Sequence, residues 1–171
     1  LPAGSIVVLH ACCHNPTGAD LSEAQWREII EVIQARGLVP FIDMAYQGFA
    51  DGIAEDALAL NLFVASGLQF FVSTSYSKSF SLYGERVGAL SVITASKDES
   101  ARVLSQIKRM IRSNYSNPPT HGGAVVAAVL GSPELRQMWE AELVVMRERI
   151  KTMRSSLVEK LKAKGVAQDF S

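Results

Sequence analysis

Three short apolar runs in this chain of 171 residues are each followed by polar side chains that could do chemistry. These side chains are, in chain order, His10, Asn15, Asp43, Tyr46, Ser75, Lys78 and Arg86. A lysine amine attacks carbonyl carbon atoms, and hydroxyl and guanidinium groups bind phosphate. Each residue alone has a simpler explanation, since Lys78 and Arg86 could be solvated loop charges and Asp43 could cap a turn.

The runs themselves have the β-branched, apolar composition that is typical of buried parallel strands. We predict strands over 5–10, 38–43, 69–74 and 88–94. After the first, Ser22 and Gln25 form a capping-box pattern, and Gly37 is placed to end the helix. A second helix is predicted near 55–66. Strands that alternate with helices indicate an α/β fold with a mostly parallel sheet flanked by helices.

The second half of the chain is predicted to be mainly helical. Helices are expected over 97–112 and 124–130, and a longer one begins with Ser132 as N-cap and Pro133 in its first turn. Its apolar stripe consists of Trp139, Leu143, Met146, Ile150, Met153 and Leu157. A helix of this length can bridge two domains, so we predict part of a large domain over 1–131, and an interdomain helix with the start of a small domain over 132–171.

Composition and charge narrow the choice of partners. The chain has 17 basic and 17 acidic residues, and a net charge of zero gives no reason to expect nucleic acid or an anionic membrane. No apolar run approaches the roughly 20 residues of a spanning helix, and the start shows no signal-peptide pattern. Cys12 and Cys13 are adjacent, which strains a disulfide, so we expect reduced thiols and a cytoplasmic protein.

The carboxyl ends of parallel strands share one edge of a sheet, and ligands bind there in such folds. The polar residues at the strand ends would therefore converge on one crevice. Together they fit pyridoxal 5′-phosphate, which needs a lysine, an acid for its pyridine nitrogen and a phosphate site. Lys78 would supply the amine and Asp43 the acid. The other contacts would come from Tyr46, Asn15, Ser75 and Arg86.

Other chemistries have less support. A metal site could use His10, Cys12, Cys13 and His14. On an extended segment, however, these side chains would point to alternate faces, and no second ligand pair follows. The chain has no G-x-S-x-G, G-x-G-x-x-G or Walker lysine motif, so serine hydrolase and nucleotide-binding functions are unsupported.

Four motifs resemble those of one enzyme family. They are HACCHNPTG (10–18), DMAYQGF (43–49), SYSKSFSLYGERVG (75–88) and RSNYSNPP (112–119). In order and spacing they resemble the aspartate and aromatic amino acid aminotransferases, class I enzymes of fold type I that depend on pyridoxal phosphate. The resemblance implies transfer of an amino group between aspartate or aromatic amino acids and 2-oxoglutarate by a ping-pong mechanism. It also implies that this chain is the central portion of a longer subunit.

The resemblance assigns roles to individual residues. Lys78 resembles the lysine that binds the cofactor and moves a proton on the substrate. Asp43 resembles the partner of the pyridine nitrogen, with His10 supporting it. The remaining cofactor ligands would be Tyr46 and Asn15 at the phenolic oxygen, and Ser75 and Arg86 at the phosphate. The family also implies a cis peptide bond between Asn15 and Pro16.

Arg112 resembles an arginine that crosses the interface of a homodimer and binds the distal carboxylate of a dicarboxylic substrate. Ser116 and Asn117 belong to the same interface loop, and Asn15 is also expected to contact the substrate. Aromatic members of the family keep this arginine, so it does not separate aspartate from aromatic substrates. The stretch 80–92 resembles the bacterial aromatic members.

Two alternatives stay open. Another fold-type I enzyme, a decarboxylase or a lyase, would use the same lysine, although Arg112 and the SNPP sequence favour an aminotransferase. A fragment without the family's N- and C-terminal parts could act only as a dimerisation module, through the apolar stripe. We expect the isolated chain to have negligible transaminase activity.

Overall fold

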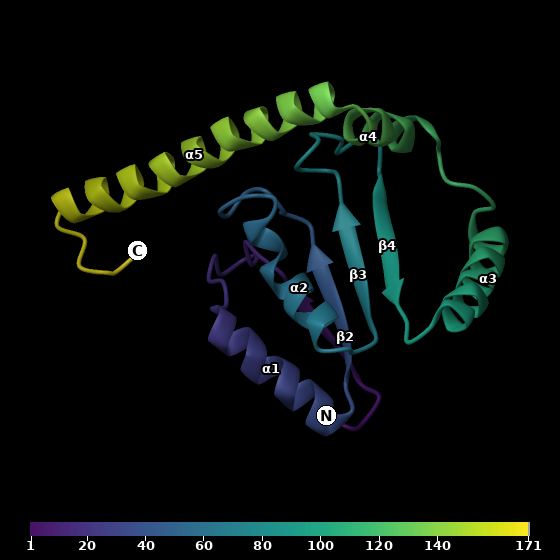
Figure 1. Cartoon of the computed structure of the whole chain (residues 1–171). Helices are drawn as coiled ribbons and strands as arrows, with labels where there is room; N and C mark the ends of the chain where they lie inside the picture. Colours follow the sequence, from purple (N-terminus) through teal and green to yellow (C-terminus); the bar gives the residue numbers. More distant parts are fainter. Residues whose placement is uncertain (171) are drawn as a thin grey trace.

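The structure is a computed structural model that describes residues 1–170, and a four-stranded sheet lies at its centre (Figure 1). The strands β1 (Ile6–His10), β2 (Val39–Met44), β3 (Phe70–Ser75) and β4 (Gly88–Ile93) lie in this order in the sheet. β1, β2 and β3 are parallel, whereas β4 runs antiparallel to β3. The predicted α/β fold with a mostly parallel sheet is therefore confirmed.

Helices cover one face of this sheet. α1 (Glu23–Arg36) connects β1 to β2, and a 3₁₀ turn (Glu55–Ala57) followed by α2 (Leu58–Ala65) connects β2 to β3. The core between them consists of Ala11, Trp26, Ile30, Ile33, Ile42, Met44, Ala59, Phe63, Phe70 and Val72. Removing this apolar surface from water is the main force that holds the two layers together.

α1 begins and ends where the sequence predicts. The Ser22 hydroxyl accepts a hydrogen bond from the Gln25 amide at 3.3 Å, and the Gln25 side chain accepts one from the Ser22 amide at 2.9 Å. Gly37 ends the helix in the left-handed region, with φ of 59°. The chain then enters β2 in the register that places Asp43 beside His10.

The opposite face of the sheet is apolar and largely open among residues 1–170. Ile6, Val8 and Leu90 on this face are 63%, 60% and 56% exposed. Phe41 and Phe71, from neighbouring strands, meet edge to face with ring centres 6.0 Å apart. Continuous apolar surface of this kind is typical of a face that other protein surface covers.

α3 (Lys97–Asn114) stands apart from the sheet (Figure 1), and none of its residues is buried. α4 (His121–Gly131) follows and begins earlier than the sequence predicts, because Gly122 is required for packing rather than for a loop. A Cβ atom added at Gly122 would come within 2.9 Å of the Glu85 side chain. Close contact with the loop after β3 therefore outweighs the low helix propensity of glycine.

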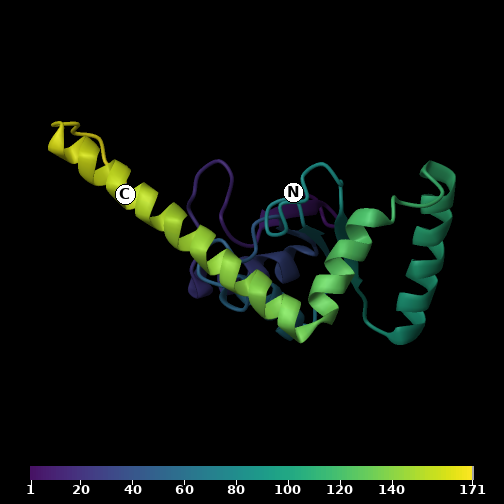
Figure 2. The ribbon, with the colours of Figure 1, turned by 90° about the horizontal axis from the view of Figure 1, so that it is seen from above.

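α5 (Pro133–Ala163) has 31 residues, which makes it about 46 Å long. The Ser132 hydroxyl accepts a hydrogen bond from the Leu135 amide at 3.3 Å, so the predicted N-cap is confirmed. α5 passes over the carboxyl ends of β2 and β3 (Figure 1), and its far half extends beyond the sheet (Figure 2).

The predicted apolar stripe of α5 is only half used. Leu143 is buried, and Trp139 and Met146 are half-buried, but the outer members Ile150, Met153 and Leu157 are exposed. The division of the chain into two domains at residue 132 coincides with the start of this helix and stays a prediction. No helix among the described residues is long and apolar enough to cross a membrane.

Candidate active site

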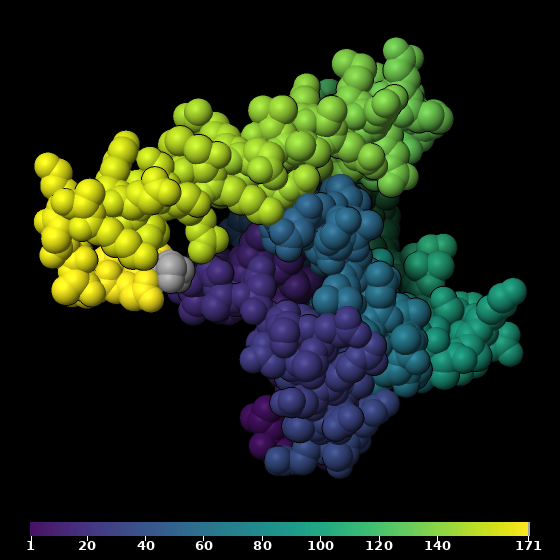
Figure 3. Space-filling model, turned by 60° about the vertical axis from the view of Figure 1, so that its left-hand side comes forward, coloured from purple at the N-terminus to yellow at the C-terminus, as the bar shows by residue number. Residues whose placement is uncertain are grey.

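Three loops meet at the carboxyl edge of the parallel strands, beneath α5 (Figure 1). They follow β1, β2 and β3, and they leave the sheet at the same edge because these strands run in the same direction. In the space-filling view, α5 lies directly on the blue surface that follows β2 (Figure 3). The arrangement brings together residues far apart in the sequence, namely His10, Asn15, Asp43, Tyr46 and Lys78.

Asp43 is the last residue but one of β2, and two neighbours flank its carboxylate. Its Oδ1 accepts a hydrogen bond from the Ser73 hydroxyl at 3.3 Å, and its Oδ2 lies 3.8 Å from Nε2 of His10. The Asn15 amide donates to Nδ1 of His10 at 3.3 Å, so neutral His10 carries its proton on Nε2, the nitrogen that faces Asp43. The Asp43 side chain is still 34% exposed, so it can accept a further N–H from a ligand.

Tyr46, Asn15 and Lys78 form a second group. Nδ2 of Asn15 donates to the Tyr46 hydroxyl at 3.4 Å, and Nζ of Lys78 lies 4.7 Å from the centre of the Tyr46 ring. The second contact is a cation–π interaction, which holds the amine over the ring. All three residues line one cavity of about 660 Å³, a volume within the range of small-molecule sites.

The walls of this cavity come from the loop after β1 and from α5. The loop contributes residues 13–18 and Asp20, and α5 contributes Ile150, Lys151 and Arg154. Nζ of Lys151 lies 3.0 Å from a carboxylate oxygen of Asp51. Lys78, after β3, and Arg154, in α5, both add positive charge to the cavity, which favours a ligand with anionic groups.

Four predicted site residues are not among the described residues that line this cavity: His10, Asp43 and the predicted phosphate ligands Ser75 and Arg86. The Ser75 hydroxyl accepts a hydrogen bond from the Ser77 amide at 3.2 Å. Ser75 lines a separate cavity of about 220 Å³, together with Trp139. Arg86 is exposed, and its guanidinium donates to the Tyr83 carbonyl at 3.0 Å. Their role at a phosphate stays a prediction.

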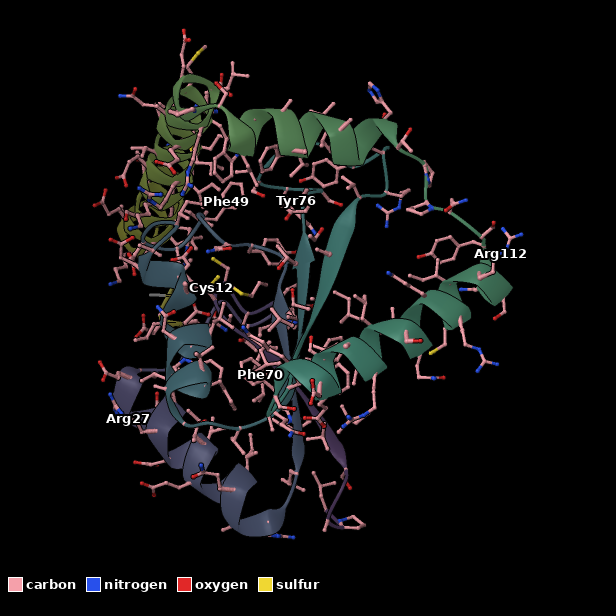
Figure 4. The ribbon with its side chains drawn as sticks, turned by 45° about the vertical axis from the view of Figure 1, so that its right-hand side comes forward. Cys12, Arg27, Phe49, Phe70, Tyr76 and Arg112 are labelled. Atoms are coloured by element: carbon pink, nitrogen blue, oxygen red, sulfur yellow. The ribbon has the colours of Figure 1, made fainter. Side chains whose placement is uncertain are left out.

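Arg112 lies near the end of α3, far from Phe49, which lines the cavity (Figure 4). Its guanidinium donates a hydrogen bond to the hydroxyl of Ser116, which belongs to the predicted interface loop. Lys108 and Arg109 lie on the same exposed surface of α3. One copy of the chain therefore does not bring Arg112 to Lys78, and its contact with substrate across a dimer interface stays a prediction.

α5 is attached to the loops after β2 and β3 by hydrogen bonds. Nε1 of Trp139 donates to the Ser79 carbonyl at 2.6 Å, next to Lys78. Nη1 of Arg147 donates to the Gly48 carbonyl at 2.9 Å, in the loop that carries Tyr46. The buried Nε of Arg147 has no hydrogen-bond partner among the described residues. The hydrogen bonds of Trp139 and Arg147 hold α5 against the loops that carry Tyr46 and Lys78.

Two aspartates hold the backbone of the loops, a role that the sequence did not predict. Asp56 is buried, and its carboxylate accepts hydrogen bonds from the amides of residues 48, 50, 51 and 52. Asp20 is exposed and accepts from the amides of Cys13 and His14. Neither aspartate belongs to a recognisable motif. Two other acidic residues near Asp56 in the sequence, Glu55 and Asp51, are exposed. Side chain to backbone bonds of this kind leave no periodic signal.

The loop after β1 has two further features that the sequence predicts. The peptide bond between Asn15 and Pro16 is cis. Cys12 and Cys13 are free thiols, the first buried and the second half-buried beside the cavity. A hydrogen bond between the two side chains raises the pKa of Cys12 and lowers the pKa of Cys13.

Comparisons with known proteins agree with this geometry. Residues 1–170 match the family described as aminotransferase class I and II. The chain is 67% identical to an aspartate aminotransferase of Pseudomonas aeruginosa over 171 residues, which are 100% of this chain and 43% of that protein. The chain thus spans less than half the length of this relative.

Solved structures give the same result. An aromatic amino acid aminotransferase of Burkholderia pseudomallei, covalently bound to pyridoxal phosphate, superposes with a TM-score of 0.96 at 68% identity, over 99% of this chain and 42% of that one. An aromatic aminotransferase of Psychrobacter sp. B6, crystallised with aspartic acid, gives a TM-score of 0.96 at 48% identity, over 99% of this chain and 43% of that one.

Proposed function

Because the chain belongs to the class I and II aminotransferases, we propose that the full-length protein transfers amino groups between amino acids and 2-oxo acids with pyridoxal 5′-phosphate. One observation carries the proposal for this chain. The Lys78 amine lies in a cavity of about 660 Å³, 4.7 Å from the Tyr46 ring and beside Asn15. The isolated chain, which covers 43% of the aspartate aminotransferase relative, is expected to be inactive.

The residues present fit this cofactor. Lys78 offers, inside the cavity, the amine that an aldehyde requires. Asp43, outside the cavity lining, offers a partly exposed carboxylate for a pyridine nitrogen. Tyr46 and Asn15 offer a hydroxyl and an amide for the phenolic oxygen. When bound, the cofactor would supply an electron sink that stabilises negative charge at the substrate α-carbon.

The chain's own residues would orient the reactants and move the proton. Lys78, once its amine is free, would remove the α-proton of the substrate and return it to a neighbouring carbon. Once Lys78 has taken the proton, the Tyr46 ring would hold the resulting ammonium group on one side through the cation–π contact at 4.7 Å. His10 would keep the Asp43 carboxylate aimed at the ring nitrogen by presenting Nε2–H to Oδ2.

The proposed substrates are aspartate or aromatic amino acids, with 2-oxoglutarate as acceptor. The relative from Pseudomonas aeruginosa is an aspartate aminotransferase, and the structures from Burkholderia pseudomallei and Psychrobacter sp. B6 are aromatic aminotransferases, the second of them crystallised with aspartic acid. A homodimer in which Arg112 reads the distal carboxylate at the partner's site is part of this proposal. The position of Arg112 outside the cavity of its own chain supports it.

We also propose a cytoplasmic location, which the adjacent free thiols of Cys12 and Cys13 support, because reducing compartments keep such thiols unpaired.

Reductive trapping tests the assignment of the lysine. The full-length protein would be mixed with pyridoxal phosphate, reduced with borohydride, digested and analysed by mass spectrometry. We expect the pyridoxyl group on Lys78. Lys151→Ala, a change in the same cavity, should keep the adduct, whereas Lys78→Ala should lose it. An adduct on another residue, or none, would refute the assignment.

Product analysis separates the reaction classes. Aspartate with 2-oxoglutarate should give glutamate and oxaloacetate. Release of carbon dioxide at the first step, without glutamate, would instead indicate a decarboxylase.

A further inference from the structure

Asp20 lies at the rim of the cavity and holds the backbone of the loop after β1. Its Oδ2 accepts a hydrogen bond from the Cys13 amide at 2.7 Å, and its Oδ1 accepts one from the His14 amide at 2.9 Å. Bonds of backbone amides to a carboxylate are charge-assisted and short, and two of them from one side chain fix both position and orientation. The carboxylate therefore fixes the two residues that immediately precede Asn15.

The backbone at this point requires such support. Cys13 has φ of 51°, a left-handed conformation that residues with a Cβ seldom adopt. The loop is closed further by the Gly18 amide, which donates to the His14 carbonyl at 2.7 Å. The His14 ring contacts the Thr17 hydroxyl at 2.6 Å. Without the carboxylate, the Cys13 and His14 amides would lose their acceptor and Cys13 would be free to leave the left-handed region.

Asn15 transmits this geometry in two directions. Its backbone amide donates to Nδ1 of His10 at 3.3 Å, which sets the tautomer that faces Asp43. Its side chain donates to the Tyr46 hydroxyl at 3.4 Å, inside the cavity. Through Asn15, the exposed carboxylate of Asp20 therefore supports both groups of site residues, His10 with Asp43 and Tyr46 with Lys78.

We propose that Asp20 is a positioning residue, which sets the Asn15 side chain at the cavity and, through the Asn15 amide, the tautomer of His10. The part that concerns the cofactor rests on the proposed function. The part that concerns His10 does not.

The first test follows the visible absorption of the full-length protein loaded with pyridoxal phosphate as a function of pH. A hydrogen-bond donor on the phenolic oxygen favours the deprotonated chromophore. Loss of this donor therefore raises the pH midpoint of the absorption change, by about one pH unit for one hydrogen bond. Asp20→Ala should raise the midpoint as Asn15→Ala does, and the double variant should shift no further than Asn15→Ala alone. Asp20→Asn, which keeps one acceptor oxygen, should shift it less.

Ser22→Ala is the matched control. It removes the N-cap of the adjacent helix, with a comparable loss of stability, and touches neither amide that Asp20 holds. Its midpoint should equal that of the unaltered protein. An unchanged midpoint in Asp20→Ala, or shifts of Asp20→Ala and Asn15→Ala that add in full, would overturn the cofactor part of the proposal.

The second test needs no cofactor. The full-length protein would be labelled with ¹⁵N-histidine, and the ring nitrogen shifts of His10 would report which nitrogen carries the proton. We expect Nε2–H in the unaltered protein and in Ser22→Ala, and a mixture of tautomers in Asp20→Ala. A His10 tautomer that Asp20→Ala leaves unchanged would refute this part. A protein that forms no chromophore but shows the tautomer change would refute the proposed function and leave the role of Asp20 toward His10 supported.

Discussion

Replacement of Asp56 by alanine would leave four backbone amides without their acceptor. Oδ2 of Asp56 accepts from Gly48 and Ala50 at 2.7 and 3.1 Å, and Oδ1 accepts from Asp51 and Gly52 at 2.9 and 3.3 Å. Asp56 is only 5% exposed, so water does not readily take the place of the carboxylate. The affected segment begins two residues after Tyr46, at the wall of the cavity.

The magnitude follows from the burial of the donors. A buried donor without a partner costs about 1–3 kcal/mol, and Gly48 and Gly52 are buried. The amides of the half-buried Ala50 and the exposed Asp51 can turn to water and cost less. We therefore expect Asp56→Ala to lower the free energy of opening this loop by about 4 kcal/mol. Such a loss corresponds to an increase of about a thousandfold in the open population.

Hydrogen exchange measures this directly, because amides exchange from the open population. The assay compares the exchange of residues 48–52 in the full-length protein and its variants by mass spectrometry. Asp51→Ala is the control in the same loop. Its side chain is 74% exposed and pairs with Lys151 at 3.0 Å, an interaction worth about 0–1 kcal/mol. Asp56→Asn, which keeps one acceptor oxygen, should lie between the two.

The comparison of Asp56→Ala with Asp51→Ala tests whether the hydrogen bonds of Asp56 hold the loop closed. If Asp56→Ala and Asp51→Ala exchange at the same rate, the four hydrogen bonds do not hold the loop and the reasoning fails.

Three further predictions concern the substrate, α5 and the thiols. Arg112→Leu in the full-length protein should lower kcat/KM for aspartate about a hundredfold or more, the worth of a bidentate carboxylate contact, and lower it far less for phenylalanine. Equal losses in steady-state kinetics would contradict a role in reading the distal carboxylate. Trp139→Phe keeps an aromatic ring beside Phe80 but loses the five-membered ring of the indole and its 2.6 Å bond to the Ser79 carbonyl, so denaturant unfolding should show a loss of at least about 1 kcal/mol. An unchanged free energy of unfolding would contradict a stabilising role for this bond. The lowered pKa of Cys13 populates its thiolate at a pH where Cys12, with its raised pKa, stays protonated. Iodoacetamide should therefore modify Cys13 first, and preferential modification of Cys12 in peptide mapping would refute the assignment.

The elements that the sequence predicts well are those that local chemistry determines. The capping box at Ser22, the left-handed Gly37 and the N-cap at Ser132 depend on neighbours three or four residues away, so the sequence alone contains the signal. That the loops carrying Asn15, Tyr46 and Lys78 meet at one cavity needs only the parallel topology. A strand pattern with helices between the strands already implies that topology.

What the sequence did not predict depends on contacts between distant segments. The direction of β4 follows from a connection over 76–87 that contains no helix and so allows an antiparallel return. The early start of α4 depends on the fit of Gly122 against Glu85. Ser75 lines a different cavity from Lys78 although only two residues separate them, because the chain turns at the end of β3.

The contact between α5 and Gly48 has a consequence for how this sequence can vary. Gly48 has φ of 97°, and a Cβ atom added there would lie 2.9 Å from the Ile53 side chain and 3.2 Å from that of Leu143. One turn further along the helix, Arg147 bonds the carbonyl of the same glycine. This φ strains any residue with a Cβ, so glycine is required at position 48 and the residues of α5 that pack on it must fit a glycine. The helix and the loop should therefore evolve as one unit, and an exchange of either between relatives should succeed only when both are moved together.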